Sequence, residues 1–204
     1  TGVCEPDTGA EIQVRAERFT QLTPLEAVKK GIAVTYQDFS LFPNLTVAEN
    51  ISISSEVEKN TGILSWRRMR DNAREVMEKM KIDIDPDAQL GALSAAKQQL
   101  VAIARVLVHD AKLLILDEPT SALSANEVDK LFGIIDQLRK QGLAILFVSH
   151  KIDEVFRISD RITVLRDGTY IGTYPVQEVT PDDIINRMVG RTVEYARCTS
   201  ENGK

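Results

Sequence analysis

The chain has 204 residues, of which 43% are apolar and 27% are charged, and its formal net charge is -5 at pH 7. This size supports one substantial hydrophobic core and argues against two. The acidic balance argues against a nucleic-acid partner, because phosphate backbones select basic surfaces. Cys4 and Cys198 have no metal-ligand spacing and indicate reduced thiols in a cytosolic setting. No apolar run approaches the roughly eighteen residues of a membrane-spanning helix, and no secretory leader is visible.

The first half of the chain predicts a hairpin, a short strand and then a mainly helical stretch. Residues 11–19 alternate loosely, as an edge strand or hairpin arm does. Residues 24–30 have a helical pattern, and residues 32–36 form a short apolar strand. From residue 47 to residue 107 the periodicity is helical. Two apolar faces mark this stretch: Met69, Ala73, Val76, Met77 and Met80, and then Leu100, Ile103 and Leu107.

The centre of the chain predicts a β-α-β unit. Residues 113–116 and 143–148 are unbroken apolar runs, each too short for a typical helix. Such runs are typical of strands buried on both faces of a parallel sheet. Between them, Ser124 and Glu127 have capping-box spacing, an apolar helical stripe follows, and Gly142 ends the helix.

The last part of the chain predicts a hairpin and one more helix. Asp167-Gly168 separates the apolar segments 162–165 and 169–173, as in a two-residue hairpin turn. Thr180-Pro181-Asp182-Asp183 begins a helix that ends near Gly190. Residues 191–204 are expected to be a polar tail or linker.

An acidic pair, Asp117-Glu118, directly follows the first apolar run. Ionised carboxylates are very costly inside a sheet, so the pair belongs at its edge. Open α/β sheets bind ligands at the carboxyl ends of their strands. There one carboxylate can hold Mg²⁺ while its neighbour orients a water for attack on a phosphate. The alternative is a strand followed by a solvated turn.

The second apolar run ends in His150, at the same edge of the same predicted sheet. A lone histidine is usually structural, but one beside an acidic pair can hydrogen-bond a terminal phosphate. We therefore expect Asp117, Glu118 and His150 to converge at one rim of the sheet. His109, the only other histidine, has no such context and is expected to be a surface residue.

Three segments together resemble the ATP-binding domain of ABC transporters. LLILDEPTSAL resembles the Walker B and D-loop segment, FVSHKIDEVFRISDRITVLRDG the switch-histidine region, and GIAVTYQDFSLFPNLTVAENI the Q-loop. The amino-acid sequences of these segments are similar to those of the first nucleotide-binding domain of ribose- and galactose-type importers. The match runs from about Pro6 to Arg191, with the motifs in the family's order.

The resemblance implies an α/β fold of P-loop NTPase type, with a parallel-sheet core and a helical subdomain at about residues 48–108. It implies one incomplete ATP-binding domain over residues 1–190. It also implies roles for individual residues: Asp117 acts through Mg²⁺, Glu118 polarises the attacking water, and His150 contacts the γ-phosphate of ATP. Gln37 would touch Mg²⁺ and relay the nucleotide state to a membrane subunit, and Ser121 would lie at the nucleotide.

The sequence departs from the family in lacking a phosphate-binding loop, G-x-x-x-x-G-K-[ST], whose backbone N–H groups and lysine hold the phosphates. The only Gly-Lys pair is Gly203-Lys204. The family places the loop before a segment such as TGVCEPDTG, so we expect Thr1 to be a cut end. We expect the 204 residues alone to bind ATP poorly.

A second departure lies at the family's signature, commonly L-S-G-G-Q or L-S-V-G-Q, where this chain has LSAAKQQ. A signature begins a helix, so its N–H groups can face the ATP of a partner domain. By resemblance, Ser94, Ala96, Lys97 and Gln98 are the nucleotide-facing positions. Ala96 adds a methyl group where glycine allows close approach. Lys97 adds a cation that attracts phosphate. Alternatively, alanine only improves the helix, since it exceeds glycine by about 1 kcal/mol.

Two other patterns suggest different functions. Ser94 and Lys97 have the S-x-x-K spacing that occurs in penicillin-binding proteins and β-lactamases. The chain lacks the S-D-N and K-T-G motifs that accompany this spacing in those enzymes, so we reject a β-lactamase-like function. The Trp66-Arg67-Arg68 stretch could be a nucleic-acid patch. With an acidic chain and an apolar stripe that starts at Met69, we favour the exposed first turn of a helix capped by Ser65.

The leading hypothesis is an ATPase subunit that powers the uptake of a monosaccharide with ATP and Mg²⁺. Its implied partners are a second ATP-binding domain, membrane-spanning permease subunits and, indirectly, a sugar-binding protein. Its expected place is peripheral, on the cytoplasmic face of the cell membrane. The alternative is a non-catalytic remnant that only binds partners. An ABC ATPase of chromosome or repair type is disfavoured, because no long heptad segment separates Gln37 from Ser94.

Overall fold

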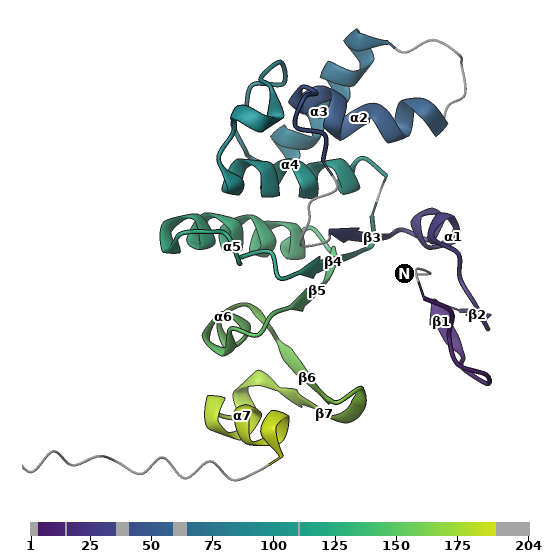
Figure 1. The fold of residues 1–204 in the computed structure, drawn as a ribbon, viewed down its shortest axis with the longest axis vertical. Helices are drawn as coiled ribbons and strands as arrows, with labels where there is room; N and C mark the ends of the chain where they lie inside the picture. The colour runs from purple at the N-terminus through teal and green to yellow at the C-terminus, as the bar shows by residue number, and fades with distance from the viewer. Residues whose placement is uncertain (1–3, 15, 36–40, 59–64, 110, 191–204) are drawn as a thin grey trace, which may run out of the picture. The chain divides into compact units, whose positions relative to one another are not determined.

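The computed structural model describes residues 4–14, 16–35, 41–58, 65–109 and 111–190. It has two compact units, Thr1–His150 and Lys151–Lys204. In the first unit a parallel sheet carries a layer of helices, and in the second a hairpin packs with two helices (Figure 1). The described helices and strands follow the predicted order, so the α/β class with a parallel-sheet core is confirmed.

The parallel sheet consists of β3 (Ile32–Thr35), β4 (Leu113–Asp117) and β5 (Ala144–Val148), with β4 in the centre. One face packs against α4 (Ala95–Leu107) and α5 (Ala125–Lys140). Leu114 and Leu116 of β4 are fully buried on this face. The central strand is therefore held on one side by apolar contact and along both edges by hydrogen bonds.

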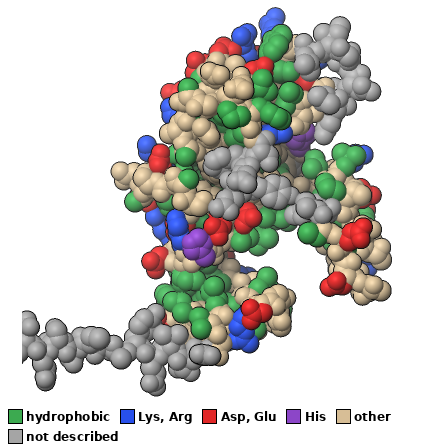
Figure 2. All heavy atoms as spheres, viewed as in Figure 1, with side chains coloured by type: hydrophobic (Ala, Val, Ile, Leu, Met, Phe, Trp, Pro, Cys, Tyr) green, Lys and Arg blue, Asp and Glu red, His purple; other side chains and the backbone are tan. Residues whose placement is uncertain are grey.

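The other face of the sheet differs from the prediction. The apolar runs were expected to be buried on both faces, and for β5 this is wrong: Leu146 is 49% and Val148 is 44% exposed. The reason is that β5 ends the three-stranded sheet, and α4 and α5 cover only the opposite face. Apolar side chains reach the surface at other places as well (Figure 2).

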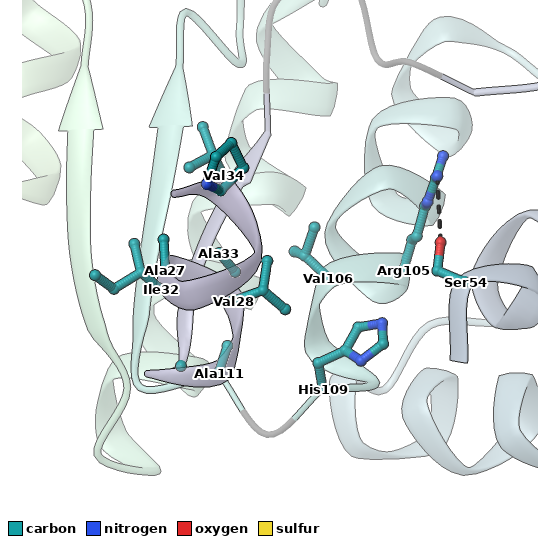
Figure 3. Close-up of a pocket in the computed structure, with 12 residues that line it drawn as sticks. Ala27, Val28, Ile32, Ala33, Val34, Ser54, Arg105, Val106, His109 and Ala111 are labelled. Carbon is teal, nitrogen blue, oxygen red and sulfur yellow. Dashed lines mark hydrogen bonds between the residues drawn. The ribbon is translucent and has the colours of Figure 1, made fainter. Parts of the chain in front are cut away.

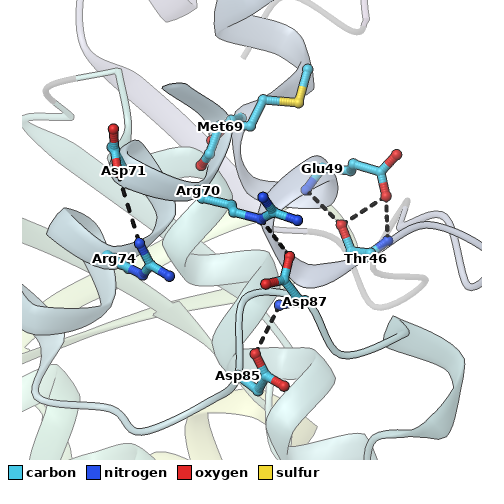
Figure 4. A network of polar contacts seen from close by, with 9 residues as sticks. Thr46, Glu49, Met69, Arg70, Asp71, Arg74, Asp85 and Asp87 are labelled. Carbon is cyan, nitrogen blue, oxygen red and sulfur yellow. Dashed lines mark hydrogen bonds and ion pairs between the residues drawn. The ribbon is translucent and has the colours of Figure 1, made fainter. Parts of the chain in front are cut away.

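A helical part precedes β4 and consists of α2 (Val47–Glu58), α3 (Trp66–Met80), the 3-10 turn η1 (Leu90–Ala92) and α4. The predicted stripe of α3 is buried. Thr46 and Glu49 form a capping box at the start of α2, since the N–H and hydroxyl of Thr46 each donate to Glu49 at 2.7 Å (Figure 4). Arg70 of α3 holds the segment before η1 through Asp87 at 2.6 Å.

Sequence-local signals also account for the remaining elements of the first unit. β1 (Ile12–Val14) and β2 (Glu17–Phe19) pair as an antiparallel hairpin. α1 (Pro24–Lys29) starts with a Thr23–Glu26 capping box and with proline in its first turn, where a missing N–H is harmless. Lys30 then pairs with Glu17 at 2.6 Å, which links the end of α1 to β2.

The second unit consists of α6 (Ile152–Ile158), β6 (Arg161–Arg166), β7 (Thr169–Pro175), η2 (Val176–Glu178) and α7 (Pro181–Val189). The predicted hairpin turn is confirmed: Asp167 and Gly168 both have positive φ, 50° and 76°, as a type I′ turn requires. Ile162, Val164 and Ile184 form its buried centre. Among the described residues of the chain, no helix has the length and hydrophobicity to cross a membrane.

A buried ion pair joins the first two long helices. The side chain of Glu56 on α2 is fully buried, and Arg68 on α3 donates to it through Nη2 at 2.7 Å and Nε at 3.2 Å. A buried carboxylate that loses its cation is costly, whereas an exposed pair contributes little.

We therefore expect Arg68→Met to lower the free energy of unfolding by about 2 kcal/mol, because the buried Glu56 side chain loses the guanidinium that donates to it. Urea unfolding measures this change. Arg74→Met on the same helix is the matched control: its Asp71 partner is 3.9 Å away and both side chains are exposed, so the expected loss is below about 0.5 kcal/mol. If the two variants lost equal amounts of unfolding free energy, the contact of Arg68 with buried Glu56 would not have the stabilising role expected here.

Candidate functional site

The carboxyl ends of β4 and β5 lie side by side. The last residue of β4, Asp117, is in register with Val148, the last residue of β5. The chain continues from these ends into Glu118 and His150, so both follow neighbouring parallel strands at one edge of the sheet. This is the position at which open α/β sheets place their ligands.

Glu118 and His150 are in contact at this edge. Nδ1 of His150 lies 2.8 Å from Oε1 of Glu118, although the residues are 32 positions apart in the chain. The side chain of His150 is 66% exposed and that of Glu118 is 31% exposed. The predicted convergence of the two side chains is thus observed, at a rim that a ligand can reach from solvent.

The backbone of Glu118 is held in an unusual conformation. Its φ is +45°, in the left-handed region that side-chain-bearing residues seldom adopt. Its N–H donates to the carbonyl oxygen of Val148 at 2.9 Å, and its own carbonyl accepts from the N–H of Ser121 at 3.2 Å. These bonds end β4 sharply and hold the chain in a conformation that tends to occur at functional sites.

The contact also defines which nitrogen of His150 faces outward. When the Glu118 carboxylate is ionised, it accepts a hydrogen bond from Nδ1–H, and the neutral ring carries its lone pair at Nε2. Nε2 can donate to an anion only when the ring holds a second proton.

Asp117 suits a magnesium ion as one of its few protein ligands. Mg²⁺ is usually bound in proteins by one or two carboxylates together with substrate phosphates and waters. Asp117 ends β4 beside Glu118, half-buried at the same edge. Within the described ranges no cluster of three or more acidic, histidine or cysteine side chains forms a metal site. The Asp117 carboxylate at this edge thus fits a Mg²⁺ ion that is also bound by a phosphate ligand.

The predicted residues of the signature lie elsewhere, whereas Ser121 lies in the turn after Glu118. Gln37 is outside the described residues. Ser94 is the N-cap of α4, where its hydroxyl accepts from the Lys97 N–H at 3.4 Å, and Gln98 folds back onto the carbonyl of Leu93 at 3.0 Å. Ser94, Ala96 and Lys97 line a cavity between α3, α4 and α5. In the described part of the chain, no hydrogen bond or ion pair joins them to the Glu118–His150 pair.

The expectation for His109 needs correction. It was predicted to be a surface residue, but it is half-buried and lines a cavity of about 330 Å³ between α1, β3 and α4 (Figure 3). Arg105 lines the same cavity, donates to Ser54 at 3.4 Å, and has its pKa lowered by burial. The cause is that α4 ends beside β3, so its last turn faces the protein. This cavity contains none of the predicted site residues.

Sequence reasoning missed Asn50, which is fully buried on α2. Its Oδ1 accepts from the Phe42 N–H at 2.8 Å, and its Nδ2 donates to the carbonyls of Phe42 at 3.0 Å and Thr46 at 2.9 Å. One amide thus holds the segment that enters α2. Nothing in the local sequence distinguishes this asparagine from a solvated helical residue.

The family model described as ABC transporter matches residues 1–121, which is more than half of the chain. The chain therefore belongs to the ABC transporter family.

Its relatives include ribose/galactose/methyl galactoside import ATP-binding proteins. Those of Burkholderia lata and Ralstonia nicotianae are each 45% identical over 94% of this chain, and that of Rhizobium meliloti is 44% identical over the same share. The matched region is only 36% to 37% of these relatives, so the chain spans about a third of their length.

Among solved structures, the chain resembles a dimeric ATP-binding cassette in a post-hydrolysis state bound to ADP and phosphate. The TM-score is 0.68 and the identity is 27%, over 83% of this chain and 74% of that one. A second dimeric cassette gives a TM-score of 0.67 at 26% identity, with the same coverage. The fold is therefore that of an ABC ATP-binding cassette.

The positive φ of Glu118 leads to a prediction about stability. Glycine adopts this conformation without steric strain, whereas alanine does not. We expect Glu118→Gly to be about 1 kcal/mol more stable to urea than Glu118→Ala. As a control, the same two substitutions at Glu127, inside α5, should favour alanine. If alanine were more stable than glycine at position 118 as well as at position 127, the backbone of Glu118 would not be strained.

Glu127 leads to a prediction about pH. The backbone N–H and then the hydroxyl of Ser124 donate to its carboxylate, at 2.9 and 2.7 Å, and hold its pKa below the ordinary 4.5. A lowered pKa in the folded state contributes stability above the unfolded value, which is lost as the pH falls through the folded value. The stability difference between the wild type and Glu127→Gln, measured by urea unfolding, should therefore shrink when the pH is lowered from 7 to about 3. A difference independent of pH would contradict this.

Proposed function

We propose that this chain forms part of an ATPase subunit that energises the import of a monosaccharide. The observation that carries the proposal is the contact of Glu118 with His150 at the carboxyl edge of β4 and β5, directly after Asp117. An acid, an imidazole and a second carboxylate at one rim are the groups that hydrolysis of a terminal phosphate requires. The names of the relatives support the sugar class.

Each residue has a role in the proposed reaction. Glu118 accepts a hydrogen bond from the attacking water and orients it toward the γ-phosphorus. It can take the water's proton as the new P–O bond forms, while the bond from the γ-phosphorus to the bridging oxygen breaks and ADP leaves with that oxygen. His150 contacts Glu118 through Nδ1, so its Nε2 is the nitrogen that would contact a γ-phosphate oxygen. Asp117 would hold Mg²⁺, with Gln37 as a further ligand. When bound, the ion would neutralise part of the negative charge of the phosphates.

The proposed assembly pairs two such domains. Residues 1–190 would form one domain, with the helical part at about residues 48–108, and residues 191–204 would connect it onward. Ser94, Ala96, Lys97 and Gln98 start α4, so the free N–H groups of its first turn can face the ATP of a second domain. Ser121, in the turn after Glu118, would lie at the same interface. We also propose that the assembly binds membrane-spanning permease subunits and acts indirectly with a sugar-binding protein. It would lie peripherally on the inner face of the cell membrane.

The test uses a chimeric protein, because the 204 residues contain no phosphate-binding loop. The segment that precedes the matched region in the Burkholderia lata relative is joined to Thr1. We expect Mg²⁺-dependent ATP binding by calorimetry and ATP turnover. Glu118→Gln should leave binding intact and reduce turnover about 10²-fold or more, since a positioned base is lost.

Glu178→Gln, an exposed change in η2, is the matched control and should leave turnover unchanged. Binding without turnover in the parent chimera would favour the non-catalytic alternative. Turnover that is equally fast in the parent and in Glu118→Gln would remove Glu118 from the proposed role.

A further inference from the structure

The position of the His150 ring depends on where β5 ends. The side chain of His150 is 66% exposed, and within the described residues its ring makes one hydrogen bond, between Nδ1 and Oε1 of Glu118. The backbone of β5 is attached to the neighbouring chain at Val148, whose carbonyl accepts from the Glu118 N–H at 2.9 Å. Only Ser149 separates Val148 from His150. A displacement of the strand end would therefore move the ring away from Glu118.

Side-chain packing must help to hold this strand end, because β5 is an edge strand. In the described structure it pairs with β4 alone, so it has one ladder of hydrogen bonds. Its side chains alternate: Ile145 and Phe147 are half-buried, whereas Leu146 and Val148 are exposed. Phe147 is therefore the last apolar side chain of β5 on its covered face.

Phe147 packs against the ring of Phe132 on α5. The ring centroids are 5.9 Å apart and the ring planes meet at 82°, which is an edge-to-face arrangement. Phe132 is 4% exposed and belongs to the buried stripe of α5. Leu116 of β4, in register with Phe147, is fully buried. Edge-to-face aromatic pairs stabilise by more than the burial of their surface alone. The ring pair thus attaches the end of β5 to α5.

The same helix is also connected to Glu118. The chain runs from Glu118 through one turn to Ser124, the N-cap of α5, whose capping box with Glu127 sets where the helix begins. A sixteen-residue helix with a buried apolar stripe is a rigid support. Glu118 is therefore positioned from α5 through the chain, and His150 is positioned from α5 through the ring pair.

We propose that Phe147 and Phe132 are positioning residues. Their contact holds the end of β5 so that Nδ1 of His150 stays within hydrogen-bond distance of Glu118. Both rings act through His150 and need no contact with a nucleotide. Their importance for ATP hydrolysis rests on the proposed function, whereas the position of His150 can be measured without ATP.

The test measures the tautomer of the His150 ring by NMR in the ¹⁵N-labelled 204-residue chain. At a pH of about 9, histidine rings are neutral and carboxylates are ionised. The shifts of the ring nitrogens then report which nitrogen carries the proton. A hydrogen bond to ionised Glu118 needs the proton at Nδ1, so the Nδ1–H form should predominate in the wild type. The chain has two histidines, and His109→Gln assigns their signals.

Phe147→Leu removes the ring and keeps an apolar side chain. We expect the ratio of the Nδ1–H form to the Nε2–H form to fall about threefold, the factor that corresponds to the loss of an edge-to-face contact. Phe132→Leu should cause the same fall, and the double variant should cause no further fall, because the two rings act as a pair. Phe147→Tyr keeps the ring and should keep the ratio.

Two controls separate positioning from stability. Ile145→Ala is the matched variant, since Ile145 lies on the same strand and the same face but further from His150. It should lower the free energy of unfolding and leave the tautomer ratio unchanged. Glu118→Ala removes the acceptor, so the ratio in this variant should no longer depend on Phe147.

Four results would overturn the proposal. They are a wild-type ring mainly in the Nε2–H form, a ratio that Phe147→Leu leaves unchanged, an equal fall in Ile145→Ala, and an equal effect of Phe147→Leu with and without Glu118. The second and third would leave the ring pair with a purely structural role.

The chimeric protein tests the consequence for hydrolysis. Phe147→Leu should reduce ATP turnover about threefold with unchanged ATP affinity, since it weakens a contact between two groups of the reaction. Unchanged turnover together with a lowered tautomer ratio would overturn the role in hydrolysis. If the parent chimera fails to bind ATP, the proposed function is wrong, and the tautomer ratio still decides whether the ring pair positions His150.

Discussion

The parallel pairing of β4 with β5 is the constraint on which the site depends. Their register ends both strands at the same level, with Asp117 beside Val148. The hydrogen bond from the Glu118 N–H to the Val148 carbonyl extends this pairing by one step beyond β4. Because the strands end together, the next residues of each, Glu118 and His150, reach contact distance. A shift of one residue would move the carboxylate to the other face of the sheet.

The site contains backbone strain that the rest of the unit must sustain. Glu118 has a positive φ, and such conformations persist only where the surrounding structure determines them. Leu114 and Leu116 anchor β4 on the face covered by α4 and α5, and the capping box of Ser124 with Glu127 sets where α5 begins. The turn between these two anchors therefore has little freedom to relax.

In the helical part, buried polar side chains contribute to packing, whereas the sheet is packed by apolar side chains. Glu56 with Arg68, and Asn50 with the segment that enters α2, are hydrogen-bonded in the interior. These contacts fix how α2 and α3 pack and where the chain enters them. The start of α4 also belongs to this part, and with α3 and α5 it lines a cavity that Gln99 and Gly133 border.

By itself, the sequence determined the elements and their class. Capping boxes, the Asp167-Gly168 turn, the helical stripe of α3 and the two short apolar runs act between residues close in the chain, and all of these elements are observed. The acidic pair and His150 could be placed at one sheet edge, because parallel strands align their carboxyl ends. Only the tertiary structure decided the exposed face of β5, the partial burial of His109 and the unpaired acceptor of Gln99. These depend on which surfaces distant segments cover, and local pattern contains no information about that.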